Sequence, residues 1–226
     1  MEVDVIILSY AKNNSIVEMN DNCINSLNNS TDEHKFNILL IETDSSKKYE
    51  YDQPNVKVIQ PGIDFNYNKF LNIGLKECKN DWVLISNNDT IYHKHFLENM
   101  FDIHRTDTTL LSLSPMDDTW HRHNTFDRLN PVYYGYRTSY ELTGWSILVN
   151  KKVFDIIGEF DEEFTFWYQD NDYSNNLRKY GIKHALITNS KVTHLLSKSH
   201  GLIEPKKKFE MTDGLGIKFI NKWRNK

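Results

Sequence analysis

The sequence has few cysteines and no long apolar segment. Only two of its 226 residues are cysteines, Cys23 and Cys78, and neither belongs to a CxxC pair or has the spacing of metal ligands. Both lie in helix-like amphipathic segments, so we expect buried free thiols, which fits a reducing, cytoplasmic setting. No run of 18 apolar residues occurs, and no transmembrane helix is therefore expected.

A signal-peptide pattern, an internal repeat and a low-complexity linker are also missing. The first residues, MEVDVIILSYAKNN, begin with an acidic residue and contain no cleavage-site pattern, so they are interpreted as a first strand. A hydrophobic content of 39% with 13% aromatics is enough for a packed core. The length suits one large α/β domain or two small ones, and without a linker we expect a single domain over residues 1–226.

Charge is unevenly distributed along the chain. The formal net charge is −4, but residues 178–226 carry 12 Lys/Arg against 3 Asp/Glu, a net of +9, which leaves −13 for residues 1–177. The basic segment, which includes Lys206, Lys207 and Lys208, suits a phosphate-bearing donor, a polyanionic acceptor such as nucleic acid, or an anionic membrane surface. The alternative is a solvated helical face and tail. The acidic balance of the whole chain disfavours a large phosphate-tracking surface.

Apolar strands alternate with helical spacing through the first hundred residues. Strands are predicted at 3–8, 36–41, 55–59 and 82–85, and helices at 16–27 and 70–78. This alternation predicts an α/β fold with a mostly parallel central sheet flanked by helices and joined by right-handed crossovers. We therefore expect a Rossmann-like nucleotide-binding half. No G-x-G-x-x-G motif follows the first strand, so a dinucleotide cofactor is not indicated.

The second half alternates less regularly. Strands are predicted at 110–114, 146–149, 184–187 and 191–193, and helices at 151–157 and around Tyr173, Leu177 and Tyr180. Between them, residues 115–140 are rich in aromatic, His and Arg side chains and show little periodicity. A loop of this length in a compact domain is usually functional or mobile. We expect it to form an acceptor-side lid.

The segment from Trp82 to Thr90, WVLISNNDT, organises the chain. Four mainly apolar residues predict a buried strand, and small polar residues ending in Asp89-Thr90 follow it. Ligands of open α/β sheets bind at this carboxyl edge. A carboxylate with amide and hydroxyl neighbours suits Mg²⁺ or Mn²⁺ held partly by a substrate phosphate. The alternative is an Asx-turn that caps a helix beginning near Tyr92.

Short motifs follow one another in a fixed order in two blocks, residues 66–90 and 141–181. They are Asn72-Ile73-Gly74, Asn87-Asn88-Asp89, Thr143-Gly144, Gly158-Glu159-Phe160-Asp161-Glu162, and Gln169-Asp170-Asn171-Asp172 with Arg178, followed by His194. This series resembles family-2 glycosyltransferases of the GT-A fold, over roughly residues 3–199. The resemblance implies transfer of a sugar from a nucleotide-diphosphate sugar to an acceptor hydroxyl, with inversion and with Mn²⁺ or Mg²⁺. It divides the chain into a donor half (1–100), an acceptor and catalytic half (101–200) and a basic tail (201–226).

The resemblance also implies roles for individual residues. Asp170 becomes the catalytic base, and Asp89 and His194 become metal ligands. The donor-binding residues are Ser9, Tyr10, Glu42, Asp44, Asn72, Asn88 and Gly144, and the acceptor-binding residues are Trp145, Trp167 and Asp172. The residues alone leave other roles open: Asp170 and Asp172 suit the N-terminus of a helix, where the dipole favours carboxylates, and Trp145 suits core packing.

Three positions depart from the family pattern. The metal motif has one Asp instead of two, Gln169 replaces a Glu, and Glu42 stands where an Asp is usual. Two other classes of function remain open. One is a nonenzymatic nucleotide-sugar or glycan-binding module on the same fold. The other is a nucleotidyltransferase, which would need a Gly-rich phosphate loop where this chain has Ser9-Tyr10-Ala11-Lys12.

Overall fold

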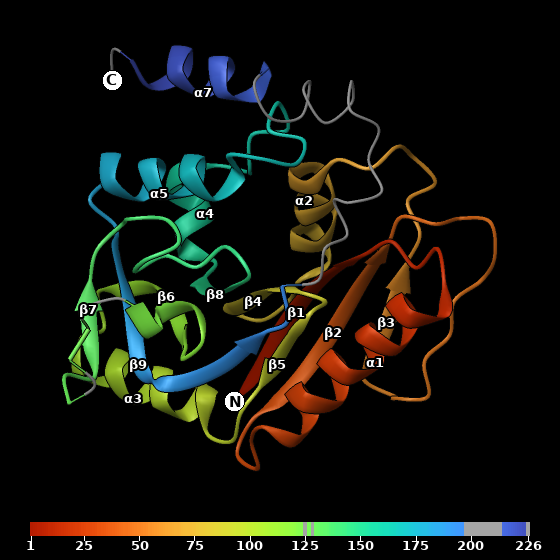
Figure 1. Cartoon of the computed structure of the whole chain (residues 1–226), viewed down its shortest axis with the longest axis horizontal. Coiled ribbons are helices and arrows are strands. Elements are labelled where there is room, and N and C mark those ends of the chain that lie inside the picture. The colour runs from red at the N-terminus through yellow and green to blue at the C-terminus, as the bar shows by residue number, and fades with distance from the viewer. Residues whose placement is uncertain (124–125, 128, 197–213, 225–226) are drawn as a thin grey trace.

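The computed structural model of the chain describes residues 1–123, 126–127, 129–196 and 214–224. A nine-stranded sheet runs through it with helices on both faces (Figure 1). The strands are β1 (Glu2–Ser9), β2 (Lys35–Glu42), β3 (Val56–Ile59), β4 (Trp82–Asn87), β5 (Thr90–Tyr92), β6 (Leu110–Asp117), β7 (Val132–Tyr134), β8 (Ser146–Asn150) and β9 (Lys183–His194). The helices are α1 (Asn14–Asn29), α2 (Tyr67–Glu77), α3 (Phe96–Thr106), the 3₁₀ turn η1 (Trp120–His123), α4 (Lys152–Ile157), α5 (Gln169–Lys179) and α7 (Leu215–Trp223). None of the helices in these ranges is both long and apolar enough to cross a bilayer.

The sheet has the order β3-β2-β1-β4-β8-β6-β9-β5, and β7 pairs with β9. The four N-terminal strands pair in parallel, as the alternating pattern predicts. β8 enters antiparallel between β4 and β6, and β5 and β7 lie antiparallel to β9. The predicted fold class, a single α/β domain with a helix-flanked sheet, is confirmed, and each of its antiparallel pairings involves β8 or β9.

Helices cover both faces of the sheet and make two separate cores. One core joins β1, β2 and β4 to apolar residues of α1 and α3, among them Leu27 and Phe96. The other joins the opposite side chains of the same strands to α2, α4 and α5, with Phe70, Val153 and Leu177 at its centre. Burial on both faces explains why the strands are continuous apolar runs instead of alternating ones.

Asp4 is a buried carboxylate in the middle of the apolar β1. Its Oδ2 accepts hydrogen bonds from the backbone N–H groups of Lys79 and Asn80 at 2.6 and 2.7 Å. Its Oδ1 accepts from the side-chain amides of Asn80 and Asn37 at 2.8 and 3.3 Å. Asp4 therefore holds the turn before β4 against β1, because a buried carboxylate is stable only when its oxygens are satisfied.

Two element boundaries differ from the prediction. The helix expected near Tyr92 begins at Phe96, because Thr90–Tyr92 forms β5 and pairs with the end of β9. The strands expected at 184–187 and 191–193 are one strand, β9, whose register against β6 shifts between Pro115 and Met116. The polar residues at the shift interrupt the apolar pattern without ending the strand.

The segment 115–140 is more structured than the predicted loop. It contains the end of β6, η1 and β7, and β7 pairs with β9. His121 is buried. Its Nδ1 lies 3.0 Å from the backbone nitrogen and 2.9 Å from the carbonyl oxygen of Asp117, and its Nε2 lies 3.0 Å from the carbonyl oxygen of Tyr140. Burial lowers the pKa of His121 and so favours the neutral ring. The closing of this segment over a donor stays a prediction.

Both cysteines are buried and free, as predicted. Burial raises the pKa of each thiol to about 12, so neither is a reactive thiolate at neutral pH.

Gly74 of α2 lies directly against β1. A Cβ added there would lie 2.8 Å from Cγ2 of Ile6, a fully buried side chain. Alanine normally stabilises a helix relative to glycine. Here we expect Gly74→Ala to lower the free energy of unfolding by about 1–3 kcal/mol, because the core has no space for the methyl group. Chemical denaturation measures this, with Lys69→Ala on the exposed face of the same helix as control. A more stable Gly74→Ala protein would contradict the close packing.

Candidate active site

Polar residues gather where β1, β2 and β4 end. The parallel registers pair Ser9 with Glu42 and Leu8 with Asn87, so the three strands end at the same edge of the sheet. Asn20 of α1 joins two of these ends. Its Nδ2 donates to Ser9 Oγ at 2.8 Å, and its Oδ1 accepts from the side-chain amide of Asn88 at 2.8 Å. Hydrogen bonds through Asn20 therefore connect the ends of β1 and β4 at the edge where a ligand is expected to bind.

Glu42 is fully buried at the end of β2. Its Oε1 accepts from the backbone N–H groups of Ala11 and Asp44 at 3.0 and 2.8 Å, which ties together the loops after β1 and β2. Its Oε2 is buried and has no hydrogen-bond partner in the described part of the chain. An unsatisfied buried carboxylate oxygen is costly, so this atom is suited to accept a hydrogen bond from a bound ligand.

Two other residues predicted at this end, Asp44 and Tyr10, differ in whether the side chain is already engaged by its neighbours. Asp44 accepts from Ser46 and from the hydroxyl of Tyr49, at 2.9 and 2.5 Å. The hydrogen bond from Tyr49 is the main cause that lowers the pKa of Asp44. Tyr10 is 44% exposed, and its ring lies 4.3 Å from Lys12 Nζ. Asp44 therefore shapes its own turn, whereas the ring of Tyr10 is available to a ligand.

Asp89 and His194 meet although 105 positions separate them in the sequence. The pairing of Thr90 with His194 aligns β5 with β9, and Leu195 N–H donates to the Asp89 carbonyl oxygen at 2.9 Å. Asp89 Oδ1 lies 3.1 Å from His194 Nε2. His194 N–H donates to Asp117 Oδ2 at 2.6 Å, so Asp117, at the end of β6, fixes the backbone of the histidine.

Aromatic rings hold the imidazole of His194. The Trp145 ring stacks on it, with centroids 4.8 Å apart and planes 7° apart. Trp120 of η1 meets Trp145 edge-on at 5.3 Å. Trp145 is only 7% exposed, which leaves little of its ring for the acceptor contact that was predicted. Its burial agrees with the packing alternative.

Asp89 and His194 bring together two kinds of side chain that divalent cations bind in proteins. The described ranges contain no cluster of three or more His, Cys, Asp or Glu side chains able to hold one. One carboxylate and one imidazole converge here, and the buried Nδ1 of His194 has no partner in the same ranges. Two protein ligands at a sheet edge suit a cation that completes its coordination with substrate phosphate and water.

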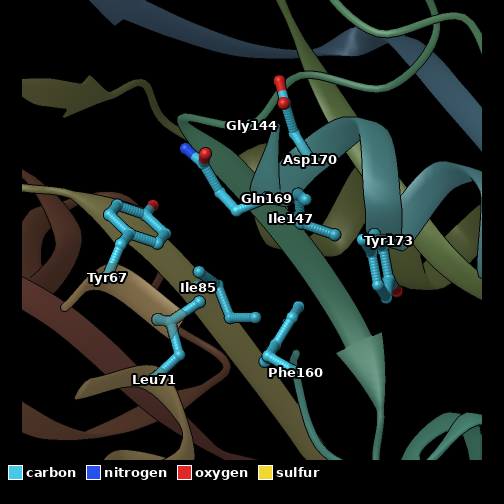
Figure 2. A pocket seen from close by; sticks show the side chains of 9 residues that line it. All are labelled: Tyr67, Leu71, Ile85, Gly144, Ile147, Phe160, Gln169, Asp170 and Tyr173. Atoms are coloured by element: carbon cyan, nitrogen blue, oxygen red, sulfur yellow. The ribbon is translucent and has the colours of Figure 1, made fainter. Parts of the chain in front are cut away.

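A small cavity of about 20 Å³, with room for about one water molecule, lies at the start of α5. Its floor is apolar and its rim is polar (Figure 2). The lining residues are Tyr67, Leu71, Ile85, Gly144, Ile147, Phe160, Gln169, Asp170 and Tyr173. The Asp170 carboxylate points away from the apolar floor, and a Cβ on Gly144 would lie 3.0 Å from Asp170 Oδ2. Glycine at position 144 therefore leaves space beside this carboxylate.

The pKa values of Asp170 and Tyr67 are both raised. Burial raises the pKa of Asp170, against the hydrogen bond that its Oδ1 accepts from Asn171 N–H at 2.9 Å. Burial also raises the pKa of Tyr67, and the negative charges of Asp170 and Asp89 raise it further. The Tyr67 hydroxyl donates to Asn87 Oδ1 at 3.2 Å. Tyr67 thus stands between the end of β4 and Asp170.

Three predicted site residues make other contacts. Asn72 accepts from Phe160 N–H at 2.9 Å and donates to the Phe160 carbonyl oxygen at 2.9 Å, so its amide holds the turn before α5. The carboxylate of Asp172 accepts from Lys222 and Trp223 of α7. Trp167 is 39% exposed, and its ring meets Phe166 edge-on. Lys206, Lys207 and Lys208 lie outside the described residues.

Sequence reasoning missed Asn20, Tyr67 and Asp117. Asn20 is a buried amide on the apolar face of α1, which is the one signal that the sequence offered. Tyr67 opens α2 directly after the capping residue Asn66, and Asp117 ends β6 as Asp89 follows β4. A polar residue placed after an apolar strand was therefore an informative signal at β6 as well.

Comparison with known proteins identifies the family. The model of glycosyl transferase family 2 matches residues 4–159. A search of curated proteins finds no match. Among solved structures, S. aureus TarS 1-349 has a TM-score of 0.60 at 16% identity, over 85% of this chain and 59% of that one. In complex with UDP-GlcNAc the same fragment gives 0.62 at 17% identity, over 98% and 67%.

GalNAc-T7, solved with UDP, GalNAc and Mn²⁺, has a TM-score of 0.65 at 14% identity, over 85% of this chain and 43% of that one. The chain thus spans 59% of the TarS fragment in its first match and less than half of GalNAc-T7. At these identities the likeness shows the fold, and the family match covers more than half of the sequence. The chain belongs to glycosyl transferase family 2 and has the GT-A fold.

Proposed function

We propose that the chain transfers a sugar from a nucleotide-diphosphate sugar to an acceptor hydroxyl, with inversion at the anomeric carbon. The observation that carries this proposal is the position of Asp170, a carboxyl of raised pKa beside Gly144, with Tyr67 between it and the Asp89 edge. Two similar structures were solved with UDP-GlcNAc and with UDP, which supports a uridine-type donor.

The donor nucleotide would bind at the ends of β1 and β2. The free Oε2 of Glu42 can accept a hydrogen bond from a base N–H or a ribose O–H, and the exposed ring of Tyr10 can stack on the base. Ser9 and Asn88 are held by Asn20 and would line the same end. This arrangement supports the predicted donor site at Ser9, Tyr10, Glu42 and Asn88.

Asp89 and His194 would hold a divalent cation. When bound, Mn²⁺ or Mg²⁺ stabilises the negative charge that develops on the departing diphosphate. The imidazole ligand favours Mn²⁺, because Mg²⁺ is bound almost entirely through oxygen. The stacking of Trp145 and the hydrogen bond to Asp117 Oδ2 restrict the motion of His194, so its Nε2 remains directed at Asp89.

Asp170 would act as the general base. Its carboxylate takes the proton of the acceptor hydroxyl, whose oxygen forms a bond to the anomeric carbon of the donor. The bond from that carbon to the diphosphate oxygen breaks at the same time, and its electron pair leaves with the diphosphate. Attack opposite to the leaving group inverts the anomeric carbon. A raised pKa makes the Asp170 carboxylate a stronger base than an exposed aspartate.

The acceptor side carries two exposed tryptophans. Trp120 and Trp167 are each 39% exposed, and the Trp120 indole N–H donates to the Ser139 carbonyl oxygen at 2.9 Å. Fixed aromatic faces suit the apolar faces of sugar rings, which favours a carbohydrate acceptor over a polyanion. The test of the whole proposal is a panel of sugar nucleotides, each measured for Mn²⁺-dependent thermal stabilisation and then for hydrolysis. A binding module would be stabilised but would hydrolyse none of them.

Asp89→Ala should abolish the Mn²⁺-dependent part of donor binding and leave the protein folded, because one of two protein ligands is removed at the sheet edge. Titration calorimetry with and without Mn²⁺ measures this, and the exposed Asp64→Ala serves as control. Unchanged metal dependence in Asp89→Ala would remove Asp89 from the metal site.

Asp170→Asn should lower the transfer rate by roughly 10²–10⁴-fold at saturating substrates, because the amide cannot accept the proton. Donor and metal binding should remain. Asp172→Asn is the matched comparison two residues away. If Asp172→Asn loses the chemical step while Asp170→Asn retains it, the base is misassigned.

The same substitution should raise stability at neutral pH. Burial gives Asp170 a higher pKa in the folded chain than in the unfolded one, so the folded state binds the proton more tightly. Stability from this group therefore falls as the pH rises from the unfolded pKa through the folded pKa. Asp170→Asn should melt above the parent protein at pH 7, and the difference should vanish below about pH 4. Equal melting temperatures at pH 7 would show that Asp170 carries no such cost.

A further inference from the structure

Helix α7 packs against the segment that leads into α5 (Figure 1). Leu215 and Gly216 of α7 are buried. The Phe219 ring stacks on Tyr168 with centroids 5.2 Å apart, and it meets Phe164 edge-on at 6.2 Å. This helix lies beyond the part of the chain that the family model matches, which ends at residue 159. Residues of α7 contact Asp161, Phe164, Tyr168 and Asp172, which lead into α5 or lie in its first turn.

Tyr168, the residue before α5, has a strained backbone. Its φ of 67° is in the left-handed region, which residues other than glycine rarely adopt. Such a conformation persists only where the surroundings impose it. Here α7 supplies part of those surroundings, since a Cβ on Gly216 would lie 2.9 Å from the Tyr168 hydroxyl and Phe219 covers the ring. The next two residues are Gln169 and Asp170.

Asp172 ties the first turn of α5 to α7 by charge. The residue is 3% exposed, and its backbone N–H donates to the Tyr168 carbonyl oxygen at 2.8 Å. Lys222 Nζ lies 2.8 Å from Asp172 Oδ1 and 2.7 Å from Asp161 Oδ2. The Trp223 indole N–H donates to Asp172 Oδ1 at 2.8 Å. Lys222 thus joins the two ends of the segment 161–172.

The opposite side of this segment is held by α2. The Tyr67 N–H donates to the Thr165 carbonyl oxygen at 2.8 Å. The side-chain amide of Asn68 donates to the backbone carbonyl oxygen of Asp161 at 2.7 Å. The turn that carries Asp170 is therefore fixed between two helices, and α7 supplies the charged half of that support.

We propose that Lys222 and Trp223 are positioning residues of the transfer reaction. Through Asp172 and Tyr168 they fix the first turn of α5, and with it the direction of the Asp170 carboxylate. This rests on the proposed role of Asp170. A reacting group displaced by about 1 Å can cost up to about 10²-fold in rate, so contacts that never touch substrate can still control turnover.

The test compares four variants by transfer kinetics, donor binding and thermal melting. Lys222→Met removes the charge, Lys222→Arg keeps it, and Trp223→Phe removes the indole N–H but keeps an aromatic ring. Lys218→Met, on an exposed position of the same helix, is the control. Lys222→Met should lower kcat about 10- to 100-fold with donor KM unchanged, Lys222→Arg should restore most of the rate, and Lys218→Met should have no effect. Trp223→Phe keeps the ion pairs and should lower kcat by a smaller factor.

A double-mutant cycle separates positioning from general support. In an Asp170→Asn background, Lys222→Met should cause no further loss of transfer, because it acts through the group already removed. The same loss in both backgrounds, or a lower melting temperature with unchanged kcat, would overturn the positioning role. If Asp170→Asn itself retains full transfer, the proposed base is wrong and the positioning role fails with it. If Asp170→Asn is inactive and the α7 variants are fully active, only the positioning role fails.

Discussion

The parallel pairing of β1 with β2 and β4 is the constraint on which the rest of the site depends. It places Ser9 beside Glu42 and Leu8 beside Asn87, so the polar residues that end three strands lie at one edge of the sheet. A slip of one residue in β4 would turn its side chains to the opposite face and shift the turn that carries Asp89 relative to Ser9 and Glu42. The two cores and the Asp4 contacts to the turn at Lys79 and Asn80 maintain this register.

The first half of the fold was predictable because its signals are local. Each buried parallel strand is a continuous apolar run, and each helix has one apolar face. The second half depends on pairings between distant residues. Nothing near Ser146 shows that β8 enters antiparallel between β4 and β6, and three residues are too few for a pattern to reveal β5.

The same distinction applies to the candidate site. The order of short motifs was enough to pair Asp89 with His194, which lie 3.1 Å apart. It could not show that the side chain of Asn72 is hydrogen-bonded to Phe160, 88 residues away, or that the carboxylate of Asp172 is hydrogen-bonded to Lys222, 50 residues away. Spacing along one helix gives the face of a side chain, but the partner on that face comes from tertiary packing.

The pairing of β9 with three other strands, β5, β6 and β7, has a consequence for how the chain folds as it is synthesised. β1 to β4 can pair with one another as soon as they emerge. Among the described residues, β5 and β7 pair with β9 alone, whereas β6 pairs with β8 on one side and with β9 on the other. β5, β7 and one edge of β6 therefore wait until β9 has been made. Nascent chains would therefore have a formed N-terminal half of the sheet beside an open sheet edge, a state prone to association with other chains.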